Sequence, residues 1–170
     1  MLSARLLLIS LITLSYLIAL PAHAARPSFI KQQPFQAIFE INNNKTVTIA
    51  ITQLMKKGAF YYHNKAYDSA LLTFDQVLFY QPKYAKAYHH RALAKAGLGQ
   101  LPEAIMDYNI AIALNPHDGN AFYNRGNAKA KLELYRDAIA DYDKAIALNP
   151  SDRLAKYNRS MAYDRLVDFD

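Results

Sequence analysis

The sequence predicts an all-α fold, a solenoid of about three and a half helix-turn-helix repeats. Three prolines, Pro82, Pro116 and Pro150, are spaced 34 residues apart. The segment EAIMDYNIAIALNP at 103–116 returns as DAIADYDKAIALNP at 137–150, with ten of fourteen positions identical. A fixed period of this length is typical of one supersecondary unit that is stacked several times. Since one such unit cannot bury its apolar face alone, neighbouring units must share a continuous core.

The first 24 residues are expected to be a secretory signal peptide. One positive charge, at Arg5, precedes fifteen almost wholly apolar residues at 6–20, and a small-x-small tripeptide follows at 22–24. This order is typical of a cleaved signal peptide, and the apolar run is shorter than the ~20 residues that span a bilayer. We therefore expect an exported protein, periplasmic or secreted. An uncleaved anchor is the alternative, and it would be the protein's only link to a membrane.

Residues 25–50 are expected to form an N-terminal extension that begins as a linker. The stretches 35–41 and 46–51 alternate around an asparagine-rich segment, which is compatible with a β-hairpin. Alternatively, Asn44 caps a helix that begins near Thr46 and continues into the first repeat. The helix is favoured here, because an isolated hairpin is only marginally stable.

Two helices are expected in each unit of the repeat domain, which covers residues 51–170. The units are 51–84, 85–118 and 119–152, followed by a C-terminal helix at 153–167. The expected first helices are 51–64, 85–98, 119–132 and 153–167, and the expected second helices are 67–80, 101–114 and 135–148. The proline at the end of each unit stops the second helix. Asp118 and Asp152 lie in the following turns and are candidate N-caps of the next first helix.

Small residues recur where the two helices of a unit face each other. On the first helices they are Gly58, Ala92, Gly126 and Ser160, and on the second helices Ala70, Ala104 and Ala138. Large side chains at other repeated positions fill the remaining space, among them Phe74, Tyr108 and Tyr142. This alternation of small and large residues predicts closely packed helical hairpins.

The 34-residue spacing and these repeated positions closely resemble the tetratricopeptide repeat family over residues 51–170. The resemblance implies a right-handed superhelix whose first helices line a concave groove, and a function in holding proteins or peptides. The groove residues it implies are Met55, Lys56, Lys86, His89, His90, Asn120, Tyr123, Asn124, Asn127, Lys131, Tyr157 and Asn158. Asparagine can donate to and accept from a peptide backbone, and tyrosine offers contact area at little entropic cost. The alternative is that these residues form an ordinary solvated helix face.

Two repeated positions depart from the usual family pattern. An apolar residue is commonest at the first, which here holds Lys57, Arg91, Arg125 and Arg159; an aromatic residue is common at the second, which holds Tyr61, Lys95, Lys129 and Tyr163. We expect these basic side chains to lie along neighbouring helices with their charged ends in water. Basic residues gather on the first helices and acidic residues on the second, so the groove should attract acidic partners. Alternatively, the charges support the packing of one helix layer on the other.

Chaperone-binding members of the family hold their partners with a clamp of Lys, Asn and Arg side chains. In the closest register, the clamp positions of this chain hold His89, Leu93, Asn124, Leu154 and Asn158. Only Asn124 matches, so we do not expect this chain to bind chaperone tails.

The sequence contains no motif for catalysis. It lacks cysteine, which excludes disulfides, thiolate metal sites and a cysteine nucleophile. It also lacks a phosphate-binding loop, HExxH and GxSxG. Adjacent residues on a helix point about 100° apart, so His89 and His90 are poorly placed to chelate one metal. A net charge of +6 is too mild to indicate nucleic acid. We predict a non-enzymatic binding scaffold without cofactor or metal, with an accessory subunit of an enzyme complex as an alternative.

The last helix, 153–167, has no second helix after it in this sequence. It carries apolar side chains around its circumference: Leu154, Tyr157, Met161, Tyr163 and Leu166. We expect partial exposure of this apolar surface, which could support docking or a homo-oligomer through residues 153–170. The alternative is a self-sufficient cap whose charged face covers the end of the stack.

Overall fold

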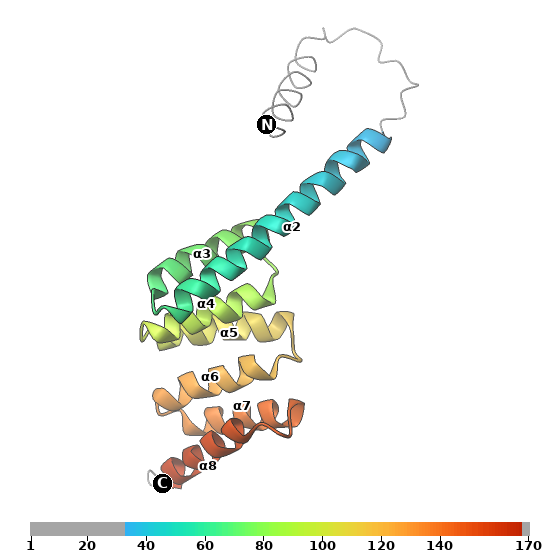
Figure 1. The fold of residues 1–170 in the computed structure, drawn as a ribbon. Helices are drawn as coiled ribbons and strands as arrows, with labels where there is room; N and C mark the ends of the chain where they lie inside the picture. The colour runs from blue at the N-terminus through green and yellow to red at the C-terminus, as the bar shows by residue number, and fades with distance from the viewer. Residues whose placement is uncertain (1–32, 168–170) are drawn as a thin grey trace, which may run out of the picture. The chain divides into compact units, whose positions relative to one another are not determined.

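The computed structural model describes residues 33–167, and within them it contains seven α-helices and no strand (Figure 1). The helices are α2 (Gln33–His63), α3 (Tyr67–Tyr80), α4 (Ala85–Gly97), α5 (Leu101–Leu114), α6 (Gly119–Lys131), α7 (Tyr135–Leu148) and α8 (Arg153–Val167). The chain divides into two compact units, Met1–Ile41 and Asn42–Asp170. The expected signal peptide lies outside the described residues. Among the described helices, none is long and apolar enough to span a membrane.

The second unit is a stack of helical hairpins, as the repeat predicts. The bounds of α3, α5, α7 and α8 are the predicted ones, and α4 and α6 each end one residue earlier. Each second helix ends at the residue before the repeated proline: Gln81, Asn115 and Asn149 have φ near −140° and ψ of 80–87°, outside the α region. A following proline disfavours the α conformation, so the prolines set these helix ends.

Aspartates start the later first helices. The side chain of Asp118 accepts hydrogen bonds from the backbone N–H groups of Asn120 and Ala121, which makes it the N-cap of α6. Asp152 accepts from the N–H of Ala155 at 2.9 Å, at the start of α8. Both predicted caps are therefore confirmed, and each satisfies backbone donors that a helix start leaves without partners.

The N-terminal extension is helical from Gln33 onward. The helix alternative is therefore the correct one for residues 35–51, and the β-hairpin alternative is wrong. The helix begins earlier than expected, so Asn44 lies inside α2 and is not its cap. Pro34 occupies the second residue of α2, where the missing N–H has no intrahelical partner to lose.

A tight turn joins the two helices of each unit through one residue in the left-handed region. That residue is Lys65 (φ 58°), Gly99 (φ 79°) or Glu133 (φ 62°). In each turn the next residue's N–H reaches back to a carbonyl five residues earlier, as in the bond from Leu134 to Lys129. Only glycine adopts this conformation without steric cost, so two of the three turns carry backbone strain.

Aromatic rings of the second helices fill the space beside the small residues of the first helices. Phe74, Tyr108 and Tyr142 are almost completely buried. A Cβ atom added to Gly58 would lie 2.5 Å from the Phe74 ring, and one added to Gly126 would lie 2.8 Å from the Tyr142 ring. The predicted role of these small residues is confirmed, because larger ones would push the hairpin apart.

Each first helix packs on the preceding second helix through buried alanines. Ala94 of α4 packs with Phe74 of α3, Ala128 of α6 with Tyr108 of α5, and Ala162 of α8 with Tyr142 of α7. A first helix inside the stack therefore has two packed faces, one toward the preceding second helix and one toward the following one. In the described residues, α8 has a preceding second helix but no following one.

Candidate functional site

The predicted groove residues lie on the first helices, at or near the surface. Consecutive first helices contact one another, α4 with α6 and α6 with α8. Five of the predicted residues are exposed: Lys56, Lys86, Asn120, Lys131 and Tyr157. The other seven are half-buried: Met55, His89, His90, Tyr123, Asn124, Asn127 and Asn158. We refer to the surface that these twelve residues form as the first-helix face.

His89 is held between two neighbouring side chains. Its Nδ1 lies 3.0 Å from Oδ2 of Asp118, and its Nε2 lies 3.1 Å from Nδ2 of Asn124. An amide nitrogen only donates, so Nε2 accepts and the ring proton sits on Nδ1, where it faces the carboxylate. The imidazole is therefore neutral and fixed in orientation, and it joins α4 to α6.

A second set of hydrogen bonds joins α6, α7 and α8. Nδ2 of Asn158 donates to Oη of Tyr123 at 3.1 Å and to Oδ1 of Asn127 at 2.8 Å. The same Oδ1 accepts from Oη of Tyr142 at 2.9 Å. Burial is the main reason that the pKa of Tyr142 rises to about 12, so its hydroxyl keeps the proton that it donates. The amides predicted to hold a ligand are thus also used to hold neighbouring repeats together.

His90 has a different environment from its neighbour. Its ring stacks on Phe74 with the ring centres 5.5 Å apart. Burial lowers the pKa of His90, and the adjacent His89 lowers it further, so the ring is neutral at neutral pH. This side chain fills space between α3 and α4, and it leaves little polar surface for a ligand.

A hollow of about 440 Å³ opens on the first-helix face between α6, α7 and α8. Its lining includes Asn127 and Asn158, together with Lys131 and Arg165. Three of the predicted site residues therefore meet here, and the sequence reasoning missed Arg165. The repeat could have located it, because Arg165 follows Lys131 by one period. The fixed amides and the two cations suit an acidic or strongly polar group.

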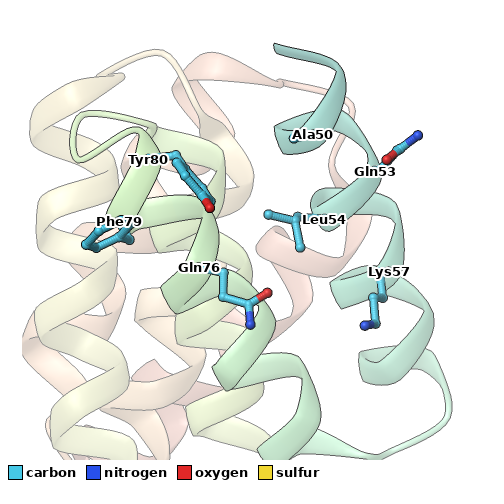
Figure 2. A pocket seen from close by; sticks show the side chains of 7 residues that line it. All are labelled: Ala50, Gln53, Leu54, Lys57, Gln76, Phe79 and Tyr80. Atoms are coloured by element: carbon cyan, nitrogen blue, oxygen red, sulfur yellow. The ribbon is translucent and has the colours of Figure 1, made fainter. Parts of the chain in front are cut away.

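A second hollow, of about 520 Å³, lies between α2 and α3, where no site residue was predicted. Figure 2 shows Leu54 of α2 pointing toward α3 and Tyr80 of α3 pointing toward α2. Gln53, Lys57, Gln76 and Phe79 complete most of the lining. Phe79 is 81% exposed at a position where the next two repeats have alanine, a difference that the sequence alignment of the repeats does contain.

The basic residues at the two unusual repeat positions form buried ion pairs, contrary to our expectation of solvated charged ends. Arg91 grips Asp107 of the following helix through two bonds, Nε to Oδ2 and Nη2 to Oδ1, each 2.7 Å long. Its Nη1 donates to Asp75 of the preceding helix at 2.6 Å. Lys95 Nζ lies 2.8 Å from Oδ2 of Asp107. The bonds to the two carboxylates, above all to Asp107, raise the pKa of Arg91.

The next repeat reproduces this cluster. Arg125 donates to Asp141 through Nε and Nη2, and its Nη1 donates to Asn109. Lys129 Nζ lies 2.9 Å from Asp141 Oδ2. The side chains of Asp107 and Asp141 are 4% and 5% exposed, so each needs a cation to stay charged where it is. Charge segregation between the helices thus supports the packing of the two layers.

The first repeat lacks this cluster and the last helix has part of it. Thr73 stands where the later repeats have aspartate, and Lys57 is exposed with its ammonium 5.7 Å from the centre of the Tyr61 ring. Arg159 of α8 donates to Asp143 alone among the described residues. The expectation of a solvated charged end is therefore wrong for Arg91, Lys95, Arg125 and Lys129. It fails because each second helix supplies an aspartate 16 residues after the arginine.

The structure offers no obvious metal centre in the range that it describes. No group of three or more His, Asp or Glu side chains there is arranged to hold a metal ion. The two adjacent histidines face different partners, Asp118 and Phe74. The candidate site is therefore the first-helix face, with its hollow at α6–α8.

Comparison with known proteins supports the repeat assignment. A family model described as tetratricopeptide repeat matches residues 119–152, and one described as TPR repeat matches residues 96–133. A comparison with curated proteins finds no match.

Several solved structures share the fold. The first TPR of Spaghetti (RPAP3) bound to HSP90 peptide SRMEEVD is 26% identical with a TM-score of 0.67, over 69% of this chain and 93% of that one. The Arabidopsis OM64 TPR domain is 25% identical with a TM-score of 0.66, over 68% and 96% of the two chains. A crystal structure of MamA, 22% identical with a TM-score of 0.65 over 76% and 73%, shows likeness of fold alone. The chain is therefore an all-α solenoid that contains tetratricopeptide repeats.

Proposed function

We propose that this protein is a non-enzymatic protein-interaction module that holds an acidic peptide or protein segment on its first-helix face. The observation that carries the proposal is the hollow at α6–α8, where Lys131 and Arg165 flank the amides of Asn127 and Asn158. A similar solved domain, the first TPR of RPAP3, is bound to the acidic peptide SRMEEVD. That similarity supports a peptide as the ligand.

The positive charge available to a ligand is smaller than the sequence alone suggests. Four basic side chains of the first helices are committed to Asp107 and Asp141. Lys56, Lys86 and Lys131 remain exposed, and no ion pair holds them within the described residues. An acidic ligand should therefore be recognised by these three lysines and by Arg165, at the rim of the hollow.

The geometry disfavours a chaperone tail as the ligand. Both ring nitrogens of His89 are already bonded, to Asp118 and Asn124. Leu93 and Leu154 stand at other clamp positions, and they cannot pair with a terminal carboxylate. We expect the peptide SRMEEVD to bind the full chain at least about tenfold more weakly than the natural partner, since each charged hydrogen bond contributes on the order of 1.5–3 kcal/mol.

The proposal places the protein outside the cytoplasm, and its support is the charged, apolar and small-x-small order of residues 1–24. N-terminal sequencing of the protein recovered from separated cell fractions tests this placement. An exported chain that begins near Ala25 agrees with it. A cytoplasmic chain that begins at Met1 contradicts it and leaves the binding proposal to its own test.

Site-specific photo-crosslinking tests the binding proposal. A photoreactive amino acid replaces Lys131 on the first-helix face, or, as the matched control, Lys144, an exposed lysine on α7. Cells are irradiated and the products identified by mass spectrometry. We expect a crosslinked partner from position 131 and little or none from position 144. Equal yields from both positions, or a product from position 144 alone, would show that the first-helix face is not the binding site.

A further inference from the structure

The repeat defines what each first helix needs on its outer side, and α8 lacks it. Arg91 and Arg125 each use the Nε and Nη2 edge of the guanidinium to hold an aspartate of the following helix. Arg159 occupies the same repeat position, but it uses only Nη1, which donates to Asp143 at 2.6 Å. Within residues 33–167, no carboxylate faces the other edge of Arg159. This edge is a vacant bidentate donor for a carboxylate.

A vacant socket for an aromatic ring lies beside that donor. The rings of Phe74, Tyr108 and Tyr142 pack on the small residues Gly58, Ala92 and Gly126. Ser160 of α8 holds the equivalent position and is exposed. The Arg159 side chain is 37% exposed, against 20% for Arg91 and 17% for Arg125. The outer side of α8 therefore presents both halves of a site that is filled in the preceding repeats.

We propose that α8 docks an acidic amphipathic helix of a partner protein, which places a carboxylate on Arg159 and an aromatic ring on Ser160. The chain itself provides the template for this helix. Asp107 and Tyr108 are consecutive in α5, and Asp141 and Tyr142 are consecutive in α7. In both helices an alanine lies three residues before the aspartate. The expected partner helix therefore carries the pattern Ala-x-x-Asp followed by Tyr or Phe.

The charge of α8 supports an acidic partner. The helix carries Arg153, Lys156, Arg159 and Arg165 against one acidic residue, Asp164. Met161 and Tyr163, on the same helix, are 41% and 48% exposed. A partner helix with acidic and apolar residues would neutralise this charge and cover these side chains. This surface differs from the hollow of the first-helix face, so the proposal stands without the proposed function.

A second copy of this chain is a poor candidate for the partner. Its two helices with the required pattern, α5 and α7, are packed inside their own repeats. Asp107 and Asp141 are each 3% exposed there, and they are already paired with arginine. The remaining second helix, α3, has Thr73 in place of the aspartate. A copy would therefore have to open its own stack to supply the helix.

The chain's own α7 segment supplies a probe. A fluorescent synthetic peptide of residues 135–148, with blocked ends, is titrated with the full chain, and anisotropy is measured. We expect binding, and we expect the Asp141→Asn peptide to bind at least about tenfold more weakly because it cannot accept the charged fork of Arg159. In the full chain, Ser160→Phe should fill the socket and abolish binding of the original peptide. Leu154→Ala, at an exposed residue on the same helix, is the matched control and should leave binding unchanged.

Further measurements cover the other outcomes. Circular dichroism confirms that Ser160→Phe folds; if it does not, Arg159→Lys replaces it, since lysine keeps the charge beside Asp143 but lacks the fork. Equal binding of the two peptides, unchanged binding by the variant, or no binding at all would overturn the proposal. If sedimentation instead shows a dimer that Ser160→Phe dissociates and the peptide does not displace, the surface belongs to a second copy. Crosslinking from position 131 should be unaffected by Ser160→Phe.

Discussion

The buried ion pair between Arg125 and Asp141 yields the sharpest prediction about stability. Arg125→Met removes the charge and keeps most of the aliphatic stem, which lies beside the Phe122 ring. Arg159→Met is the matched control, because Arg159 holds the same repeat position in α8. The two substitutions are chemically identical, and only the burial and the number of partners differ.

The expected cost follows from what each arginine leaves behind. Arg125→Met removes two charged hydrogen bonds from Asp141, whose side chain is 5% exposed, and leaves only Lys129 as its counter-ion. Breaking a buried pair costs on the order of 3–5 kcal/mol, and the remaining lysine should reduce this to about 2–3 kcal/mol. Arg159 pairs with Asp143, which is 49% exposed, so its loss should cost less than about 1 kcal/mol.

Urea unfolding followed by circular dichroism measures both values, with the slope compared to confirm that the same surface is exposed. Repeat proteins can unfold in stages, so the variants are compared with a nearest-neighbour fit where the slope changes. Added salt should reduce the small effect of Arg159→Met and alter that of Arg125→Met much less. The reasoning fails if Arg125→Met costs less than about 1 kcal/mol or no more than Arg159→Met.

Three further substitutions test other parts of the structure. Gly126→Ala should lower the unfolding free energy by about 1–2 kcal/mol, because the new Cβ meets the Tyr142 ring, which Asn127 holds in place; urea midpoints check this. Glu133→Gly should raise the thermal midpoint, since it relieves a φ of 62° at a cost of roughly 1 kcal/mol, whereas Gly99→Ala should lower it. The lowered pKa of His90 means that the unfolded chain binds more protons below about pH 6.5, so stability should fall from pH 7 toward pH 5. His90→Asn should flatten that fall in urea midpoints, and an unchanged slope would assign it to other groups near the ring, such as His89, Asp118, Lys86 or His63.

Most of the fold could be predicted because proline and small residues act locally. A proline fixes the end of each second helix through the backbone of the residue before it, so helix bounds follow from sequence position. Gly58 and Gly126 mark close helix contacts for an equally local reason. The start of α2 was placed too late because the asparagine-rich segment reads as a cap or a turn, whereas the structure continues the helix through it.

The ion clusters and the hydrogen bonds of the site were missed because they depend on how helices face each other. Arg91 and Asp107 are 16 residues apart, and Asn124 contacts a histidine 35 residues earlier. Neither separation follows from the period of one helix; each depends on the stacking of repeats. The sequence did contain a signal, since an aspartate recurs at 107 and 141 beside an arginine and a lysine four residues apart. The positions of the candidate residues could thus be predicted, but not the bonds among them.

The central claim is that the first-helix face holds an acidic partner, and charge reversal tests it most directly. The affinity of the full chain for the partner captured by crosslinking is measured for Lys131→Glu and, as the control, for Lys144→Glu. Like charges across an interface cost several kcal/mol, so Lys131→Glu should weaken binding by at least about tenfold, while Lys144→Glu should leave it unchanged. Equal affinities for Lys131→Glu and the unmodified protein would contradict the claim.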